Sequence, residues 1–194
     1  MIGSYRGCVI AALALLSTAA CSHSDSKGDK SSNATASAGI TDPVASAMTA
    51  APPAVSAKAT IVAAKADGSM NTLRAGTNGF TCMPDNPVTP GPDPMCMDAN
   101  AMRWASAWIK HEAPPKETTG FMYMLAGGTD ASNTDPYAKA PTTGGDWIKT
   151  GPHVMIVGSE LALQGYPSGP NPDTAQPYVM WAGTPYAHLM IPVQ

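Results

Sequence analysis

Two short stretches of the chain each place a histidine and a methionine two residues apart. GPHVMIVG contains His153 and Met155, and AHLMIPV contains His188 and Met190. Both stretches have the apolar character of a strand, and side chains two apart on a strand point to the same face. Imidazole and thioether groups are ligands that copper accepts, so each pair is a candidate copper ligand set.

A third stretch, GFMYML, carries Met122 and Met124 at the same spacing. If the three strands are neighbours in compatible register, the imidazoles and thioethers converge on one face of a sheet. The competing interpretation is core packing, because methionine is a flexible filler of protein cores. One sequence shows neither strand order nor register, so both interpretations stay open at this stage.

A longer spacing connects one of these strands to another histidine. His111 is followed by ten residues and then Met122, and His153 and Met155 come later, which gives H-x10-M…H-x-M. This spacing resembles the signature of the periplasmic copper chaperones, a family of cupredoxin-like proteins. The resemblance implies a cupredoxin-like domain whose copper ligands are His111, Met122, His153 and Met155. The strand pattern adds His188 and Met190 as companion ligands.

Other stretches of the domain carry a broader resemblance. GFTCMPD, GTDASNTDPYA and PYVMWAGTPYAHLM are similar to exported bacterial proteins to which no function is assigned. This resemblance implies export, and it implies no particular chemistry.

The first residues have the pattern of a secretory signal. Arg6 precedes the apolar run 9–16, which is shorter than the about 20 residues that a membrane-spanning helix needs. Cys21 follows Ala19 and Ala20, an arrangement that resembles the lipobox of bacterial lipoproteins. The resemblance implies a signal peptide over residues 1–20, a lipid on Cys21 and, with Ser22 next, an outer-membrane anchor that faces the periplasm. The alternative is an ordinary signal, cleaved nearby, that leaves Cys21 free.

Composition then divides the mature chain in two. Residues 21–58 are mostly Ser, Ala, Thr, Gly, Lys, Asp and Pro, which predicts a lipidated flexible tether. Residues 59–194 have the length of one domain. The formal net charge of the whole chain is -3, and neither a basic stripe nor a polybasic membrane patch is present in the sequence. We therefore expect no nucleic-acid partner, and an envelope protein is the partner class left open.

Two cysteines, Cys82 and Cys96, remain inside the domain. In an oxidising envelope such a pair usually forms a disulfide, which here would staple a proline-rich loop. The rival interpretation is a thiolate metal site, because methionines flank both cysteines and soft sulfur ligands suit Cu(I). We favour the disulfide.

Local patterns predict the elements that position these residues. The turn pair Asp67-Gly68 predicts a hairpin over 59–74, and Asp98 is a plausible N-cap for an amphipathic helix that runs to His111. Apolar runs bounded by turn residues predict strands at 121–125, 147–150, 154–157, 178–181 and 189–193, with the last two joined as a hairpin. The predicted fold is mainly β (α+β), an antiparallel sandwich or partial barrel with one amphipathic helix.

Signatures of common enzymes are absent from the sequence. It contains no G-x-S-x-G, no H-E-x-x-H, no P-loop and no dinucleotide fingerprint. Asp130, Asn133 and Asp135 are oxygen donors at a spacing unlike that of an EF-hand, and turn chemistry explains them equally well. The leading hypothesis is an envelope lipoprotein that binds or delivers copper. The alternatives are a structural or protein-interaction module of the outer membrane and, less favoured, an enzyme with an aromatic pocket around Trp147, Tyr166, Tyr178 and Trp181.

Overall fold

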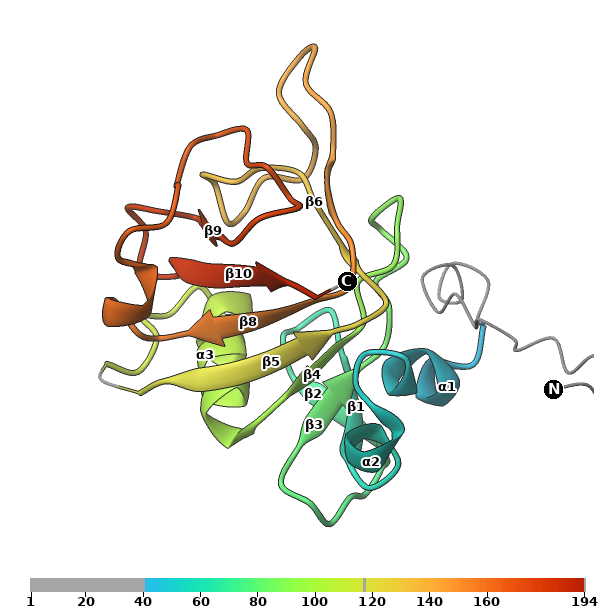
Figure 1. Ribbon diagram of the computed structural model, residues 1–194. Helices are drawn as coiled ribbons and strands as arrows, with labels where there is room; N and C mark the ends of the chain where they lie inside the picture. The colour runs from blue at the N-terminus through green and yellow to red at the C-terminus, as the bar shows by residue number, and fades with distance from the viewer. Residues whose placement is uncertain (1–40, 117, 194) are drawn as a thin grey trace, which may run out of the picture. The chain divides into compact units, whose positions relative to one another are not determined.

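The computed structural model describes residues 41–116 and 118–193 (Figure 1). The predicted signal peptide over 1–20, the lipidation site Cys21 and the tether as far as residue 40 lie outside the described residues. These three expectations therefore stay predictions. Within the described residues no helix is both long and apolar enough to cross a membrane.

One eight-stranded sheet forms the centre of the domain. In spatial order its strands are β2 (Met70–Arg74), β1 (Thr60–Ala64), β3 (Thr81–Met83), β4 (Met95–Met97), β5 (Gly120–Met124), β8 (His153–Val157), β10 (His188–Pro192) and β9 (Tyr178–Met180). A separate antiparallel pair is formed by β6 (Gly128–Asp130) and β7 (Ile148–Thr150). The predicted mainly β, α+β class is confirmed.

Strand pairing in the large sheet is antiparallel with one exception. β1 runs parallel to β3, through Thr60 with Thr81 and Ile61 with Cys82, so the sheet is mixed but mainly antiparallel. The reason lies in the chain path. The hairpin places β2 on one side of β1, and residues 75–80 bring the chain back to the other side of β1.

Both predicted hairpins are confirmed. β1 pairs with β2 across the turn at Asp67-Gly68, where the Asp67 carboxylate accepts hydrogen bonds from the backbone N–H and the hydroxyl of Ser69, and Gly68 has a φ of 77°. That positive φ is unfavourable for any residue with a Cβ. β9 pairs with β10, as expected for the last two strands.

The predicted amphipathic helix is α3 (Ala99–Ile109). Asp98 caps it, because its Oδ1 accepts the N–H of Ala101 at 2.8 Å while its Oδ2 accepts the N–H of Phe121 at 3.2 Å. The same carboxylate therefore fixes the helix start to strand β5. The buried side of α3 includes Ala101, Trp104 and Ala105, and the helix packs against β4 and β5, lying behind β5 and β8 in Figure 1.

The structure corrects the predicted tether boundary at residue 58. Two further helices, α1 (Pro43–Met48) and α2 (Pro53–Ser56), precede β1, so the described domain begins near Asp42 and contains more than one helix. Asp42 caps α1 through the N–H of Val44 at 3.0 Å. Ala47 and Ala50 are fully buried. The segment has few large apolar residues, a composition typical of a tether, yet small side chains such as Ala47 and Ala50 are buried in the domain.

The two faces of the sheet bury different side chains. We call methionine face the side that carries α3; its buried members include Met83, Met97, Met122, Met124, Met155, Met180 and Met190. We call disulfide face the side that carries α1 and α2; its buried members are Ala47, Ala50, Ala51, Ala59, Ile61, Cys82 and Cys96. Neighbouring residues of one strand, such as Cys96 and Met97, therefore belong to different faces.

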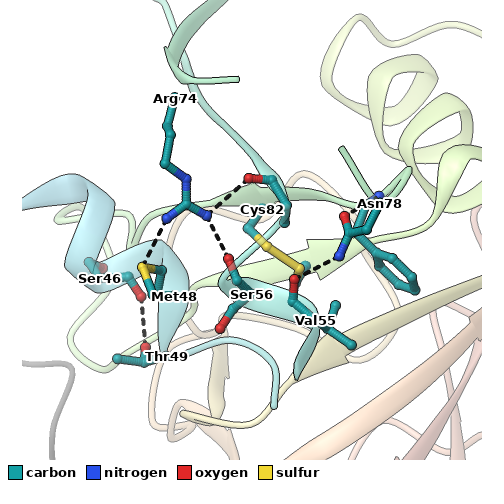
Figure 2. The surroundings of a disulfide bond; sticks show 11 residues. Ser46, Met48, Thr49, Val55, Ser56, Arg74, Asn78 and Cys82 are labelled. Carbon is teal, nitrogen blue, oxygen red and sulfur yellow. Dashed lines mark hydrogen bonds between the residues drawn. A yellow bond between two sulfur atoms is a disulfide. The ribbon is translucent and has the colours of Figure 1, made fainter. Parts of the chain in front are cut away.

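Cys82 and Cys96 are register partners on β3 and β4 and form a disulfide, as favoured from the sequence. The thiolate metal site is thereby excluded in this state. Figure 2 shows how the N-terminal helices are held beside the bond: the Arg74 guanidinium donates to the carbonyls of Ser56 and Ala59, and Asn78 donates to the carbonyl of Val55. The disulfide face is thus closed by backbone acceptors as well as by packing.

Candidate metal centre

Strand register brings the predicted methionines into one row. Met122 on β5 is opposite Met155 on β8, and Met155 is opposite Met190 on β10. The row continues to β4, where Met97 is opposite Met122. Each of these side chains is at most 6 % exposed. Residues directly opposite one another have Cβ atoms about 5 Å apart, so four adjacent strands line up their thioethers across the methionine face.

His153 and His188 lie on the same face, one on each side of the row along the strand direction. His153 is opposite Met124 on β5, while His188 is opposite Met180 on β9 and Val157 on β8. Val157 is four residues from His153 along β8, which corresponds to about 13 Å at the usual rise of a strand. The structure therefore brings both imidazoles to the methionine row without bringing them to one point.

Each histidine is tied to the backbone through Nδ1. The Nδ1 of His153 lies 2.8 Å from the carbonyl oxygen of Gly151, and the Nδ1 of His188 lies 2.9 Å from that of Tyr186. A carbonyl can only accept, so Nδ1 carries the hydrogen and Nε2 carries a lone pair. Both Nε2 atoms are buried without a hydrogen-bond partner. This arrangement, with one nitrogen anchored and the other free, is that of a metal-ligating histidine.

Burial also keeps both rings uncharged. Desolvation lowers the pKa of His153 to about 4, against the opposing effect of the Gly151 carbonyl. Desolvation likewise lowers the pKa of His188 to about 4, and the charge of His153 adds to that shift. At neutral pH both imidazoles are therefore neutral, which is the protonation state that binds metals.

A glycine leaves room beside the His153 ring. A Cβ placed on Gly128 would lie 2.9 Å from Cε1 of His153, 3.6 Å from its Nε2 and 3.4 Å from Cε of Met124. The tips of His153 and Met124 therefore converge next to Gly128. Met124 was recognised in the sequence as sharing a face with Met122, but the spacing alone gave no reason to pair it with a histidine.

The ring of His188 is enclosed by tryptophans. Its centroid lies 5.3 Å from that of Trp104 and 4.9 Å from that of Trp181, with both pairs edge to face. Trp181 has a φ of 57°, and its Nε1 donates to the carbonyl of Ser132. These two tryptophan rings cover the His188 imidazole and exclude water from it. Met180, the register partner of His188 on β9, could not be selected from the sequence because only strand order reveals it.

His111 does not join this group. It follows the C-terminus of α3, has a φ of 58°, is exposed and stacks on Tyr137 with ring centroids 3.9 Å apart. Of the ligand set that the family resemblance implies, the structure places Met122, His153 and Met155 on one face and His111 on the surface. The helix before Pro114 carries His111 away from the sheet.

The candidate oxygen donors differ in their surroundings, and the buried Oδ1 of Asn133 has no hydrogen-bond partner. Asn133 is buried and donates to the carbonyls of Gly169 and Val179, and Asp135 accepts the N–H of Tyr137. Burial raises the pKa of Asp130 to about 7, with a further contribution from the charge of Asp93. Among residues 41–116 and 118–193, no group of three or more His, Cys, Asp or Glu side chains is placed to hold a metal ion. A metal here would need thioethers.

The aromatic residues considered for an enzyme pocket are dispersed between interior and surface. Tyr178 and Trp181 are buried in the core, whereas Tyr166 is 42 % exposed. A surface pocket of about 330 Å³ lies instead on α3, lined in part by Arg103, Lys110 and Glu112. The structure therefore gives the enzyme hypothesis no assembled polar cluster among these aromatics.

Comparisons with known proteins add no assignment. No protein-family model matches the chain. Searches of curated proteins and of solved structures find no match either. Functional arguments for this chain therefore rest on its own residues.

Proposed function

We propose that the protein binds Cu(I) on the methionine face. The observation that carries the proposal is the pair of buried, unpartnered Nε2 atoms of His153 and His188, which lie on either side of a thioether row. Neutral imidazoles and thioethers are soft or borderline ligands, and they suit Cu(I) better than Mg²⁺ or Ca²⁺.

The free-energy cost of burying two imidazole nitrogens without hydrogen bonds supports a binding role for them. A buried polar atom without a hydrogen bond costs about 1–3 kcal/mol, and this face contains two such imidazole nitrogens in the same tautomeric state. If these two histidines only filled the core, apolar side chains of similar volume would do so without this cost. Metal coordination would satisfy both lone pairs and would explain why the sulfur atoms are aligned and not scattered.

The proposal includes a cellular setting. Lipidation of Cys21, as the lipobox-like sequence predicts, would hold the domain at the outer membrane on its periplasmic side. Copper taken up there would be kept in the reduced state by the ligands and by the dry, aromatic surroundings of His188. Binding or delivery of copper in the envelope is the function we assign.

Anaerobic titration of the mature chain with Cu(I) against a competing chelator tests this function, with the Cys82–Cys96 bond verified by mass. We expect tight binding in wild type and at least a tenfold loss in Met155→Leu/Met190→Leu. Met48→Leu is the matched control, because Met48 packs on the disulfide face. Absence of binding in wild type, or equal affinity in the double variant, would contradict the proposal.

A second candidate function is a protein-interaction module. Phe121, Val154, Ile156 and Ile191 are only partly buried on the face opposite the methionines, and Leu161 in the adjoining η2 (Leu161–Leu163) is 79 % exposed. Hydrogen exchange in outer-membrane vesicles and in the soluble chain tests this idea. Extra protection of β8 and η2 in vesicles would support a docked partner, and equal protection would argue against one.

A further inference from the structure

The methionine face has two ends, and each end has its own histidine and its own methionine. We infer that it holds two separate Cu(I) centres, one at His153 with Met124 and the other at His188 with Met180. The inference rests on the proposed function and goes beyond it in number, position and ligands. The sequence places Met124 among the thioethers of this face without pairing it with a histidine, and it gives no role to Met180.

The anchoring hydrogen bonds keep the two imidazoles apart. β8 and β10 are antiparallel, so Gly151 lies beyond His153 at one end and Tyr186 lies beyond His188 at the other. Each ring is therefore held by a carbonyl on its outer side. The backbone positions of the two residues are offset by about 13 Å along the strands, and each ring is anchored on its outer side, so we assign each Nε2 its own ion.

The first centre is formed where β5 and β8 meet β6. His153 and Met124 are opposite one another in register, and both side-chain tips approach the position that a Cβ of Gly128 would fill. His153 is fully buried and its Nε2 has no partner. Met155, two residues along β8, lies on the same face and supplies a further thioether.

The second centre is formed where β10 meets β9. His188 and Met180 are opposite one another in register, and each is 1 % exposed. Met190, two residues along β10, lies on the same face as His188. Trp104 and Trp181 enclose the His188 ring, so this centre is apolar on the sides that the thioethers do not cover.

The test counts ions in the mature chain with its disulfide intact. Anaerobic Cu(I) titration against a chelator is combined with native mass spectrometry of wild type, His153→Gln, His188→Gln and the double variant. We expect two ions in wild type, one in each single variant and none held tightly in the double variant. X-ray absorption should show one nitrogen ligand per copper in wild type.

Gly128→Ala provides a variant that changes no ligand. Its methyl group occupies the space beside His153 and Met124, so we expect it to lose the first ion and to keep the second with unchanged affinity. Thermal unfolding would reveal whether His153→Gln fails to fold. In that case Gly128→Ala still tests whether the first ion binds independently of the second. Loss of both ions in folded Gly128→Ala would contradict two independent centres.

The outcomes distinguish the inference of two centres from the proposed function, Cu(I) binding, on which it rests. One ion in wild type, lost in either single histidine variant, would overturn the two centres and leave Cu(I) binding intact. Two ions that survive in the double histidine variant would overturn the ligand assignment. No ion in wild type would overturn the proposed function, and the inference with it.

Discussion

The two faces of the same strands are built from different kinds of core. On the disulfide face, Ala47 of α1 and the alanines Ala50 and Ala51 between α1 and α2 cluster with the Cys82–Cys96 disulfide. On the methionine face, long flexible thioethers surround two histidines whose Nε2 atoms have no partner. The first core has few ways to rearrange, whereas thioether side chains can adapt to a bound ion. The comparison indicates that one face fixes the fold while the other is available for chemistry.

Acid should destabilise the methionine face most. The pKa of each buried histidine is about 4 in the folded state, below the usual 6.5, so the unfolded chain binds more protons between these values. Stability from the two neutral rings is complete above pH 6.5 and is lost as the pH falls towards 4. At pH 5 the loss is about 2 kcal/mol for each histidine.

Urea unfolding of metal-free wild type and His153→Gln/His188→Gln at pH 7.5 and pH 5 measures this effect. Asp93 and Asp130, whose raised pKa values of about 6 and about 7 act in the opposite direction, are common to both proteins and cancel in the difference. We expect the difference in unfolding free energy to move by about 4 kcal/mol in favour of the variant at pH 5. Parallel pH profiles would show that the rings are not buried neutral.

Removal of the disulfide should have the next largest effect on the unfolding free energy. Cys82 and Cys96 are 14 residues apart, and closure of a loop of this length stabilises a fold by about 3 kcal/mol in the chain-entropy model. Cys82→Ala/Cys96→Ala should therefore lower the unfolding free energy by about that amount while Cu(I) stoichiometry is retained at low temperature. Loss of copper binding in the folded double variant would mean that the two faces are not separable.

Removal of the helix N-caps Asp98 and Asp42 should have smaller effects on the unfolding free energy, and the two substitutions compare one helix on each face. Asp98→Ala removes acceptors for both Ala101 and Phe121, so we expect a loss of about 1–2 kcal/mol from the helix that covers the methionine face. Asp42→Ala removes one exposed cap bond to Val44 on α1 and should cost less. Chemical denaturation of the two variants measures both effects. A larger loss for Asp42→Ala would mean that α1 contributes more to stability than its single cap bond indicates.

The smallest effect on stability is expected for Met155→Leu. The substitution conserves volume and apolar character, so the metal-free unfolding free energy should change by less than about 1.5 kcal/mol. Cu(I) affinity should nevertheless fall, because the side chain loses its sulfur. A large loss of stability with unchanged affinity would return Met155 to the role of a core residue.

Local chemistry made part of this fold predictable. The Asp67-Gly68 pair and the spacing of apolar residues after Asp98 determine structure within a few residues, so the hairpin and α3 were confirmed close to their expected bounds. The helices α1 and α2 were not predicted because the burial of this segment depends on small side chains, such as Ala47 and Ala50, that cluster with the distant residues Cys82 and Cys96. Small side chains give no periodic signal that distinguishes such a segment from a tether.

The candidate centre was predictable only in its residue types. The alternation in GFMYML and PHVMIV correctly gives which side chains share a face of a strand, but register between strands far apart in sequence is set by the whole sheet. For this reason His153 and Met124 could each be selected as candidates, while their pairing across β5 and β8 could not be predicted. His111 was misplaced because a spacing pattern carries no information about where α3 ends.

Strand order has a consequence for how the protein is made. β10 follows every other strand in the chain, yet it is inserted between β8 and β9 inside the sheet. Until β10 emerges during synthesis, β8 has an unpaired edge and β9 has no partner, a state open to mispairing. His188 and Met190 arrive on this same strand. A nascent or truncated chain that stops short of β10 would therefore lack His188 and, with it, the second of the two inferred copper centres.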